Sequence, residues 1–230
     1  MRNRYYVLFV IILIILGIGE CAKTGQSPPV SSEMSLHPAS PGTSAISAYY
    51  SVLQNKAPFF SIDAKKDINI AQLNLAVSSD SSVKAKVTKF AIVDLEKDDV
   101  PEVVLWLAVN GNDDFGFEVL RYHDGVVYGY TLPYRSFMDL KDDGTFSFSG
   151  GAADYGFGTV KFTEKGYAID KISYSESGYD SSNNQIISYF VNRESAAKED
   201  FLSAINKQSK KPAATWYDFT DDNIGDKMCR

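Results

Sequence analysis

The segment from Val87 to Val191 alternates short apolar stretches with polar turn residues, at intervals of about 8 to 12 residues. Three of the turns, at 123–125, 142–144 and 164–166, end in a glycine, where a tight hairpin requires a positive φ. The spacing predicts an antiparallel meander of about eight strands. The predicted strands are Val87–Leu95, Glu102–Val109, Phe115–Tyr122, Val126–Leu132, Thr145–Ser149, Gly156–Phe162, Tyr167–Ser175 and Gln185–Val191.

A helix is predicted on each side of this β-rich segment. Thr43 or Ser44 can cap a helix that runs to Asn55, and Ser195 begins a second helix that runs to Gln208. Between the first helix and the first strand, residues 62–83 have no sustained pattern and are predicted to be irregular. The apolar residues at helical spacing are Ile46, Tyr49, Tyr50 and Leu53 in the first helix, and Ala197, Phe201, Leu202 and Ile205 in the second.

These elements predict an α+β fold. One curved antiparallel sheet carries an N-terminal and a C-terminal helix on it, in a single globular domain that spans residues 44–230.

The N-terminus has the pattern of an export signal, assigned here to residues 1–20. Arg2 and Arg4 precede an apolar run from Tyr5 to Ile18, which is shorter than the ~20 residues of a membrane-spanning helix. Cys21 follows directly, as in bacterial lipoproteins, where this cysteine is acylated and anchors the protein to the cell membrane, facing outward. Glu20 stands where such signals carry a small residue, so cleavage after Gly19, which would give a secreted protein, is the alternative.

The next segment, residues 21–43, is rich in Ser and Pro and has no apolar periodicity. Such a composition cannot bury enough surface to offset its ordering entropy, so we predict a tether. Cys229, near the C-terminus, is predicted to be a free peripheral thiol.

Charge and composition exclude several classes of function. The net charge is −6, so the chain lacks the basic face that nucleic acid requires, and no nucleic-acid partner is expected. Two histidines and two cysteines leave little material for a zinc site, a Ser-His-Asp triad or a disulfide scaffold. The nucleophile-elbow, P-loop, dinucleotide-binding, HExxH and paired CxxC motifs are absent from the sequence.

One acidic segment has the ligand types of a calcium site. Asp94, Glu96 and Asp98 alternate along an extended stretch and Glu102 follows, so their oxygens can converge on a hard cation such as Ca²⁺. Asp99 stands where such loops carry glycine, which favours weak binding. The alternatives are a turn whose aspartates cap backbone amides, and a pair of carboxylates that act as acid and base. Ca²⁺ is the only cofactor predicted.

Several aromatic residues are candidates for ligand binding. Tyr128, Tyr130, Tyr134 and Tyr155 could form a platform for sugar rings, and period two places Tyr128 and Tyr130 on one face of a strand. Aromatic residues also suit buried strands, so a core position is the alternative.

Two stretches of the chain resemble a known group of proteins. The segment FAIVDLEKDDVPEVVLWL (Phe90–Leu107) is similar to a strand, Asp-x-Asp-x-Asp-Gly-x-Pro-Glu, strand pattern, and the C-terminal part (Ile187–Gln208 and Thr215–Ile224) is similar to the ending of the same proteins. These proteins are exported, largely uncharacterised lipoproteins of Gram-positive gut bacteria. The resemblance implies an extracellular, surface-tethered domain and no particular reaction.

The sequence thus favours a monomeric, non-catalytic module that binds an extracellular ligand, such as a glycan or a protein, with a weak Ca²⁺ site. The alternatives are a carboxylate-dependent extracellular hydrolase such as a glycosidase, and a structural interaction domain.

Overall fold

A computed structural model describes residues 41–228 of the chain. The predicted export signal, Cys21, most of the predicted tether and Cys229 lie outside the described residues. None of the helices within residues 41–228 combines the length and the apolar character needed to cross a membrane.

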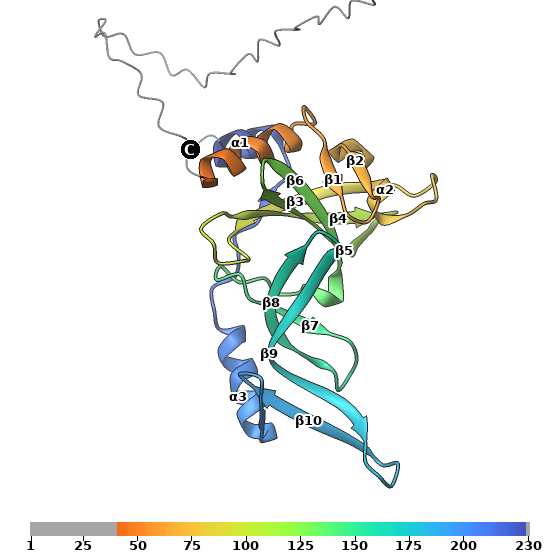
Figure 1. Cartoon of the computed structure of the whole chain (residues 1–230), viewed down its shortest axis with the longest axis vertical. Helices are drawn as coiled ribbons and strands as arrows, with labels where there is room; N and C mark the ends of the chain where they lie inside the picture. The colour runs from red at the N-terminus through yellow and green to blue at the C-terminus, as the bar shows by residue number, and fades with distance from the viewer. Residues whose placement is uncertain (1–40, 229–230) are drawn as a thin grey trace, which may run out of the picture. The chain divides into compact units, whose positions relative to one another are not determined.

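Within residues 41–228, twelve strands form two separate sheets. Figure 1 shows strands of both sheets. The first sheet has seven strands in the order β12-β3-β4-β5-β6-β1-β2, and the second has five in the order β11-β10-β9-β8-β7. All neighbouring strands are antiparallel except β1 and β6.

The first sheet consists of β1 (Phe59–Ser61), β2 (Lys66–Ile68), β3 (Ala85–Val93), β4 (Glu102–Val109), β5 (Asn112–His123), β6 (Val126–Pro133) and β12 (Tyr217–Asp218). The second consists of β7 (Phe146–Ser149), β8 (Tyr155–Thr163), β9 (Gly166–Tyr179), β10 (Gln185–Val191) and β11 (Glu194–Ala196). The helices are α1 (Pro41–Leu53), α2 (Asn74–Val77), α3 (Lys198–Ser209) and α4 (Asp221–Met228), with short 3₁₀ turns η1 (Ile70–Gln72) and η2 (Tyr134–Ser136).

The α+β class and both predicted helices are confirmed, and all eight predicted strands are present. The structure differs in dividing the strands between two sheets and in adding β1, β2, β11 and β12. The segment predicted to be irregular contains β2, η1 and α2. Helix α1 begins at Pro41, within the predicted tether, and α3 begins at Lys198 because the residues just before it pair with β10 as β11.

The turn chemistry follows the prediction. Asp124 and Gly125 both have positive φ values (49° and 84°), as a two-residue hairpin of the right twist requires. Gly144 (72°) and Gly166 (148°) also have positive φ values. Glycine adopts these values without the steric cost that a side chain would add.

Alternate residues of β4 face two different hydrophobic cores. Val103, Leu105 and Leu107 belong to a first core, whereas Val104 and Trp106 face a second core on the opposite side of the sheet. This alternation follows from the two-residue period of a strand. With both faces covered, seven of the eight residues of β4 are buried.

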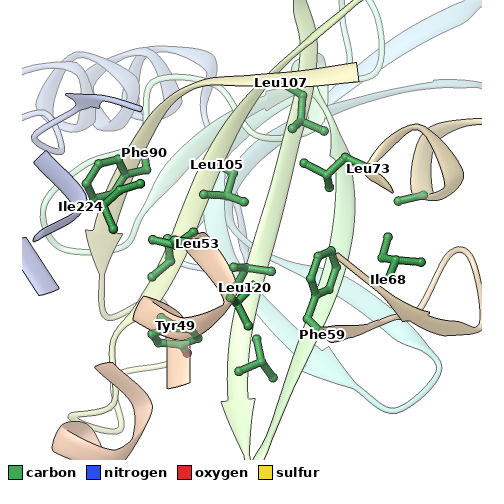
Figure 2. Close-up of a cluster of buried hydrophobic side chains, with 14 of the residues drawn as sticks. Tyr49, Leu53, Phe59, Ile68, Leu73, Phe90, Leu105, Leu107, Leu120 and Ile224 are labelled. Atoms are coloured by element: carbon green, nitrogen blue, oxygen red, sulfur yellow. The ribbon is translucent and has the colours of Figure 1, made fainter. Parts of the chain in front are cut away.

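The first core lies between the first sheet and the helices α1 and α4 (Figure 2). Tyr49 and Leu53 from α1 and Ile224 from α4 pack against Phe90 and Leu105 of the sheet. The Tyr49 hydroxyl also accepts a hydrogen bond from the backbone N–H of Tyr122 (2.7 Å), so α1 is joined to β5 by a polar contact.

The second core joins the two sheets. Phe146 and Phe162 of the second sheet belong to it together with Val104 and Tyr130 of the first. The rings of Tyr130 and Phe162 lie 4.6 Å apart. The Tyr130 hydroxyl donates to the backbone oxygen of Thr163 (3.1 Å), which fixes β6 against the end of β8.

Helix α3 covers the second sheet through Phe201. This side chain is fully buried, and its ring lies 5.3 Å from that of Tyr155 and 5.4 Å from that of Tyr189. Leu202, which was predicted to be part of the apolar stripe, is 44% exposed. The apolar face of α3 is therefore narrower than predicted, because Phe201 rather than Leu202 makes the contact with the sheet.

Candidate binding pocket and acidic loop

The acidic loop, residues 94–102, connects β3 to β4. Asp94 Oδ1 accepts hydrogen bonds from the N–H groups of Lys97 (2.7 Å) and Asp98 (3.2 Å), and its Oδ2 accepts from Asp99 (3.2 Å). Asp98 Oδ1 accepts from the N–H of Val100 (3.0 Å). Lys97 and Asp99 have positive φ values (62° and 65°), and the Asp94 carboxylate satisfies the backbone donors that this tight bend leaves unpaired. The geometry matches the interpretation of a capped turn.

The two glutamates of the loop have other partners. Glu102 is 1% exposed, and its Oε2 accepts from the N–H of Leu95 (2.8 Å). The pKa of Glu102 is raised to about 8, mainly by burial and to a smaller extent by the neighbouring carboxylates of the loop. Glu96 forms an ion pair with Arg121 of β5 and accepts from the N–H of Phe162 on β8 (3.3 Å). Glu96 therefore links the two sheets.

Within residues 41–228, no group of three or more His, Cys, Asp or Glu side chains could hold a metal ion. The carboxylates of Asp94, Glu96, Asp98 and Glu102 are instead engaged by backbone N–H groups and by Arg121. Calcium binding at this loop stays a prediction.

The structure does not bring the four candidate tyrosines together. Tyr130 is 1% exposed, so its ring lies in the core and cannot contact a ligand. Tyr128 shares the face of Tyr130, as predicted, and packs edge-to-face against Phe60. Tyr155 contacts Phe201 at the second sheet. Tyr134 lines a cavity that also contains both tryptophans.

This aromatic pocket is a cavity of about 310 Å³ on the second-core side of the first sheet. Its volume lies at the lower end of the range of small-molecule sites. The lining side chains include Trp106, Phe117, Tyr134, Phe137, Asp139 and Trp216.

Phe117 is the centre of the ring cluster. It is 2% exposed, and its ring centroid lies 5.1 Å from that of Trp106, 5.9 Å from that of Trp216 and 6.1 Å from that of Tyr134. Trp106 and Trp216 contact each other at 5.1 Å with an interplanar angle of 72°. Trp106, Trp216 and Tyr134 are each partly exposed, so the pocket presents aromatic surface to solvent.

Strand pairing positions these rings. Phe117 lies opposite Trp106 on β4 and opposite Leu132 on β6. Trp216 directly precedes β12, which pairs with β3, and Tyr134 begins η2 directly after β6. The pocket thus combines side chains from β4, β5, η2 and the segment that precedes β12.

Gly116 permits the close approach on which the position of Tyr134 depends. A Cβ atom at residue 116 would lie 2.2 Å from the backbone oxygen of Leu132 and 3.1 Å from the backbone nitrogen of Tyr134. Its φ of 153° is also one that side chains rarely adopt. Any larger residue would push the start of η2 away from Phe117.

The polar groups of the pocket are few. Asp139 Oδ1 forms an ion pair with Lys141 Nζ (2.9 Å), and Lys141 Nζ also donates to the backbone oxygen of Ser209 (3.2 Å). Trp106 Nε1 donates to the backbone oxygen of Asp113 (2.6 Å). The Tyr134 hydroxyl and Trp216 Nε1 make no hydrogen bond to any residue within 41–228. They are available to a bound molecule.

The sequence pattern points to Tyr134 as a candidate but not to Trp106 and Trp216, which line the same cavity. Trp106 lies within the predicted strand Glu102–Val109, in which nearly every residue is apolar. The available signal was rarity, because these are the only two tryptophans in the chain. Two tryptophans 110 positions apart carry no information on their contact until the strand order is known.

Several further cavities are larger and more polar than the aromatic pocket. One of about 570 Å³ lies between α3 and the second sheet and is lined by exposed polar residues such as Asn192, Glu194 and Lys207. Another of about 340 Å³ is lined by Arg135, Lys171 and several serines. Neither of these two contains a cluster of aromatic rings.

No protein-family model, curated protein or solved structure matches this chain.

Proposed function

We propose that this protein is a non-catalytic binding module that works outside the cell, and that the aromatic pocket is its binding site. The observation that carries the proposal is the cluster of three partly exposed rings, Trp106, Trp216 and Tyr134, around the buried ring of Phe117. Aromatic surface left open in a cavity is characteristic of ligand sites, because a ligand can remove it from water.

The distribution of acidic groups supports binding over hydrolysis. A glycosidase needs a carboxylic acid of raised pKa beside its substrate. Two carboxyl groups of raised pKa, Glu102 and Glu118, are 1% and 0% exposed and line none of the cavities described above. The acid at the aromatic pocket, Asp139, is paired with Lys141. A hydrolase remains the alternative.

A structural interaction domain is favoured by a different feature. The far end of the β9–β10 hairpin carries Tyr179 (70% exposed), Ile186 (44%) and Ile187 (44%). These three are a majority of the five exposed large apolar side chains within residues 41–228. Apolar groups gathered on one projection are typical of a protein contact.

The proposed location is the outer face of the cell membrane, with a lipid on Cys21. The charged and apolar N-terminus and the lipoprotein resemblance support this. Incorporation of labelled fatty acid that is lost in Cys21→Ser is expected. Release of the unlabelled protein into the medium would indicate cleavage after Gly19 and secretion.

Tryptophan fluorescence tests the binding site directly, since both tryptophans of the chain line the pocket. We expect a ligand found in a screen of extracellular glycans and peptides to change the emission on titration. Trp216→Ala should weaken binding of that ligand at least tenfold. Tyr179→Ala, which removes an exposed ring elsewhere, is the control and should leave affinity unchanged. Equal affinity of Trp216→Ala and the unmodified protein would contradict the proposed site.

A further inference from the structure

We infer that the aromatic pocket takes an uncharged sugar residue of a glycan. This inference rests on the proposed function, and it identifies the class of ligand from the charge, the polar atoms and the size of the pocket.

The charge at the pocket is balanced. Asp139 is the acidic residue of the lining, and Lys141 Nζ lies 2.9 Å from its Oδ1. The Lys141 side chain is only 4% exposed, so its ammonium group is fixed beneath the carboxylate and does not reach a ligand itself. An ammonium ligand would compete with this internal partner for Asp139. An anionic ligand would meet the outer carboxylate, which is 46% exposed, on a chain of net charge −6. An uncharged ligand neither competes with Lys141 nor is repelled by the Asp139 carboxylate.

The polar atoms that remain available are those that hydroxyl groups can bind. Trp216 Nε1 is a donor, and the Tyr134 hydroxyl can both donate and accept. Neither forms a hydrogen bond within residues 41–228. The exposed carboxylate of Asp139 can accept from a further hydroxyl while it keeps its contact with Lys141.

A sugar ring offers the matching combination. Its axial C–H groups form an apolar face that packs on an aromatic ring, and its hydroxyl groups project around the rim. A purely apolar ligand would use the walls but would form no hydrogen bond with Tyr134 and Trp216.

The size of the cavity limits the contact to one ring. A volume of about 310 Å³ is at the lower limit for a small-molecule site, so one residue of a glycan chain is accommodated and its neighbours extend into solvent.

The test uses the full-length protein in detergent and follows tryptophan emission. Neutral hexasaccharides of glucose, mannose, galactose, xylose and N-acetylglucosamine are titrated alongside an anionic oligogalacturonate, tetramethylammonium and naphthalene. We expect at least one neutral hexasaccharide to bind, and the three other probes to bind at least tenfold more weakly or not at all.

Matched variants separate hydrogen bonding from ring contact. Tyr134→Phe keeps the ring and removes one polar atom, so it should weaken glycan binding by about two- to twelvefold, the range for one hydrogen bond. Trp216→Phe keeps a six-membered ring but loses the indole N–H and part of the aromatic surface, so it should weaken binding by at least as much. Tyr179→Phe removes a hydroxyl far from these residues in the second sheet and should have no effect.

The outcomes distinguish the two proposals. If no neutral glycan binds but tetramethylammonium or naphthalene does, and Trp216→Ala removes that binding, the sugar inference is overturned and the pocket remains the site. If a neutral glycan binds with equal affinity to the protein and to Trp216→Ala and Trp106→Ala, both proposals are overturned. Binding that Tyr134→Phe and Trp216→Phe leave unchanged overturns the sugar inference alone.

Discussion

At the scale of single residues, the most unusual feature is a carboxyl group buried in the first sheet. Glu118 of β5 is fully buried, and one of its oxygens accepts from the Thr131 hydroxyl (2.8 Å). The other, Oε1, has no hydrogen-bond partner among residues 41–228. Burial raises the pKa of Glu118 to about 8, with a smaller contribution from the carboxylate of Asp63. The side chain is therefore neutral at neutral pH.

This predicts a loss of stability as the pH rises from about 5 to about 8. The unfolded chain releases the Glu118 proton at its ordinary pKa of 4.5, whereas the folded chain keeps it up to about pH 8. Folding thus takes up a proton in this window, and the free energy of unfolding falls as pH rises through it. Glu118→Gln is neutral throughout, so its melting temperature should fall less than that of the unmodified protein between about pH 5 and pH 8.

Thermal melts followed by circular dichroism measure the effect. Glu164→Gln changes an exposed turn residue and should reproduce the unmodified pH dependence. Glu102, whose pKa is also raised to about 8, should supply the dependence that remains in Glu118→Gln. An identical slope in Glu118→Gln and the unmodified protein would show that Glu118 is ionised in the folded state.

Among the candidate site residues, the sequence predicted which side chains share a face of a strand, but not which of them reach solvent. The period of β6 placed Tyr128 and Tyr130 on one face correctly, but whether that face meets water depends on the second sheet, which covers it with Phe162. Tyr134 remains accessible because it lies just beyond the strand, on η2. Whether a side chain is exposed depends on the packing of other elements against its strand, so the pattern of one strand does not predict it.

At the scale of elements, long periodic segments were predictable and short ones were not. The limits of β4, Glu102–Val109, are those predicted, because an apolar run ends there at a glycine turn on one side and a proline on the other. Strands β1, β2, β11 and β12 have three residues or fewer, too few for a period to be recognised. They exist because a neighbouring strand supplies their hydrogen bonds. The division of the strands into two sheets also depends on tertiary packing, so the sequence pattern did not predict it.

The acidic loop is the element with the sharpest test. Because Asp94 accepts three backbone hydrogen bonds, Asp94→Ala should lower the free energy of unfolding by about 1–2 kcal/mol, as for loss of a capping side chain. For a turn held by these bonds alone, the loss should be equal in about 10 mM Ca²⁺, roughly ten times the weakest constant typical of extracellular sites, and in excess chelator.

Chemical denaturation with and without Ca²⁺ measures the free energy of unfolding, and thermal melts under the same conditions measure the melting temperature. Calcium that raised the melting temperature of the unmodified protein but not of Asp98→Asn would instead establish the metal site predicted from the sequence.

At the scale of the whole molecule, one side chain connects the two sheets through both of its oxygens. Glu96 pairs with Arg121 of the first sheet and accepts from a backbone N–H of the second, at Phe162. Both charged side chains are only 16% exposed. The polar contacts of Glu96 and the ring contact between Tyr130 and Phe162 together join the two sheets.

We predict that Glu96→Gln lowers the free energy of unfolding by about 1–3 kcal/mol, because it leaves Arg121 partly buried without its opposite charge. Glu176→Gln is the matched control, since it breaks an ion pair with Lys171 that is largely exposed, and should cost less than about 1 kcal/mol. Urea titrations compare the two variants. Equal losses would mean that the Glu96 ion pair does not hold the sheets together.

The alternation along β4 also fixes how this domain meets a surface. Helix α1, through which the chain enters the domain, and α4, with which the described chain ends, lie on one face of the first sheet, and Trp106 projects from the other. A bead, a chip or a fusion partner joined at residue 41 or at residue 228 therefore approaches the helical face. The sheet stands between that attachment and the aromatic pocket, so an immobilised copy keeps the pocket open to large, chain-like ligands arriving from solution.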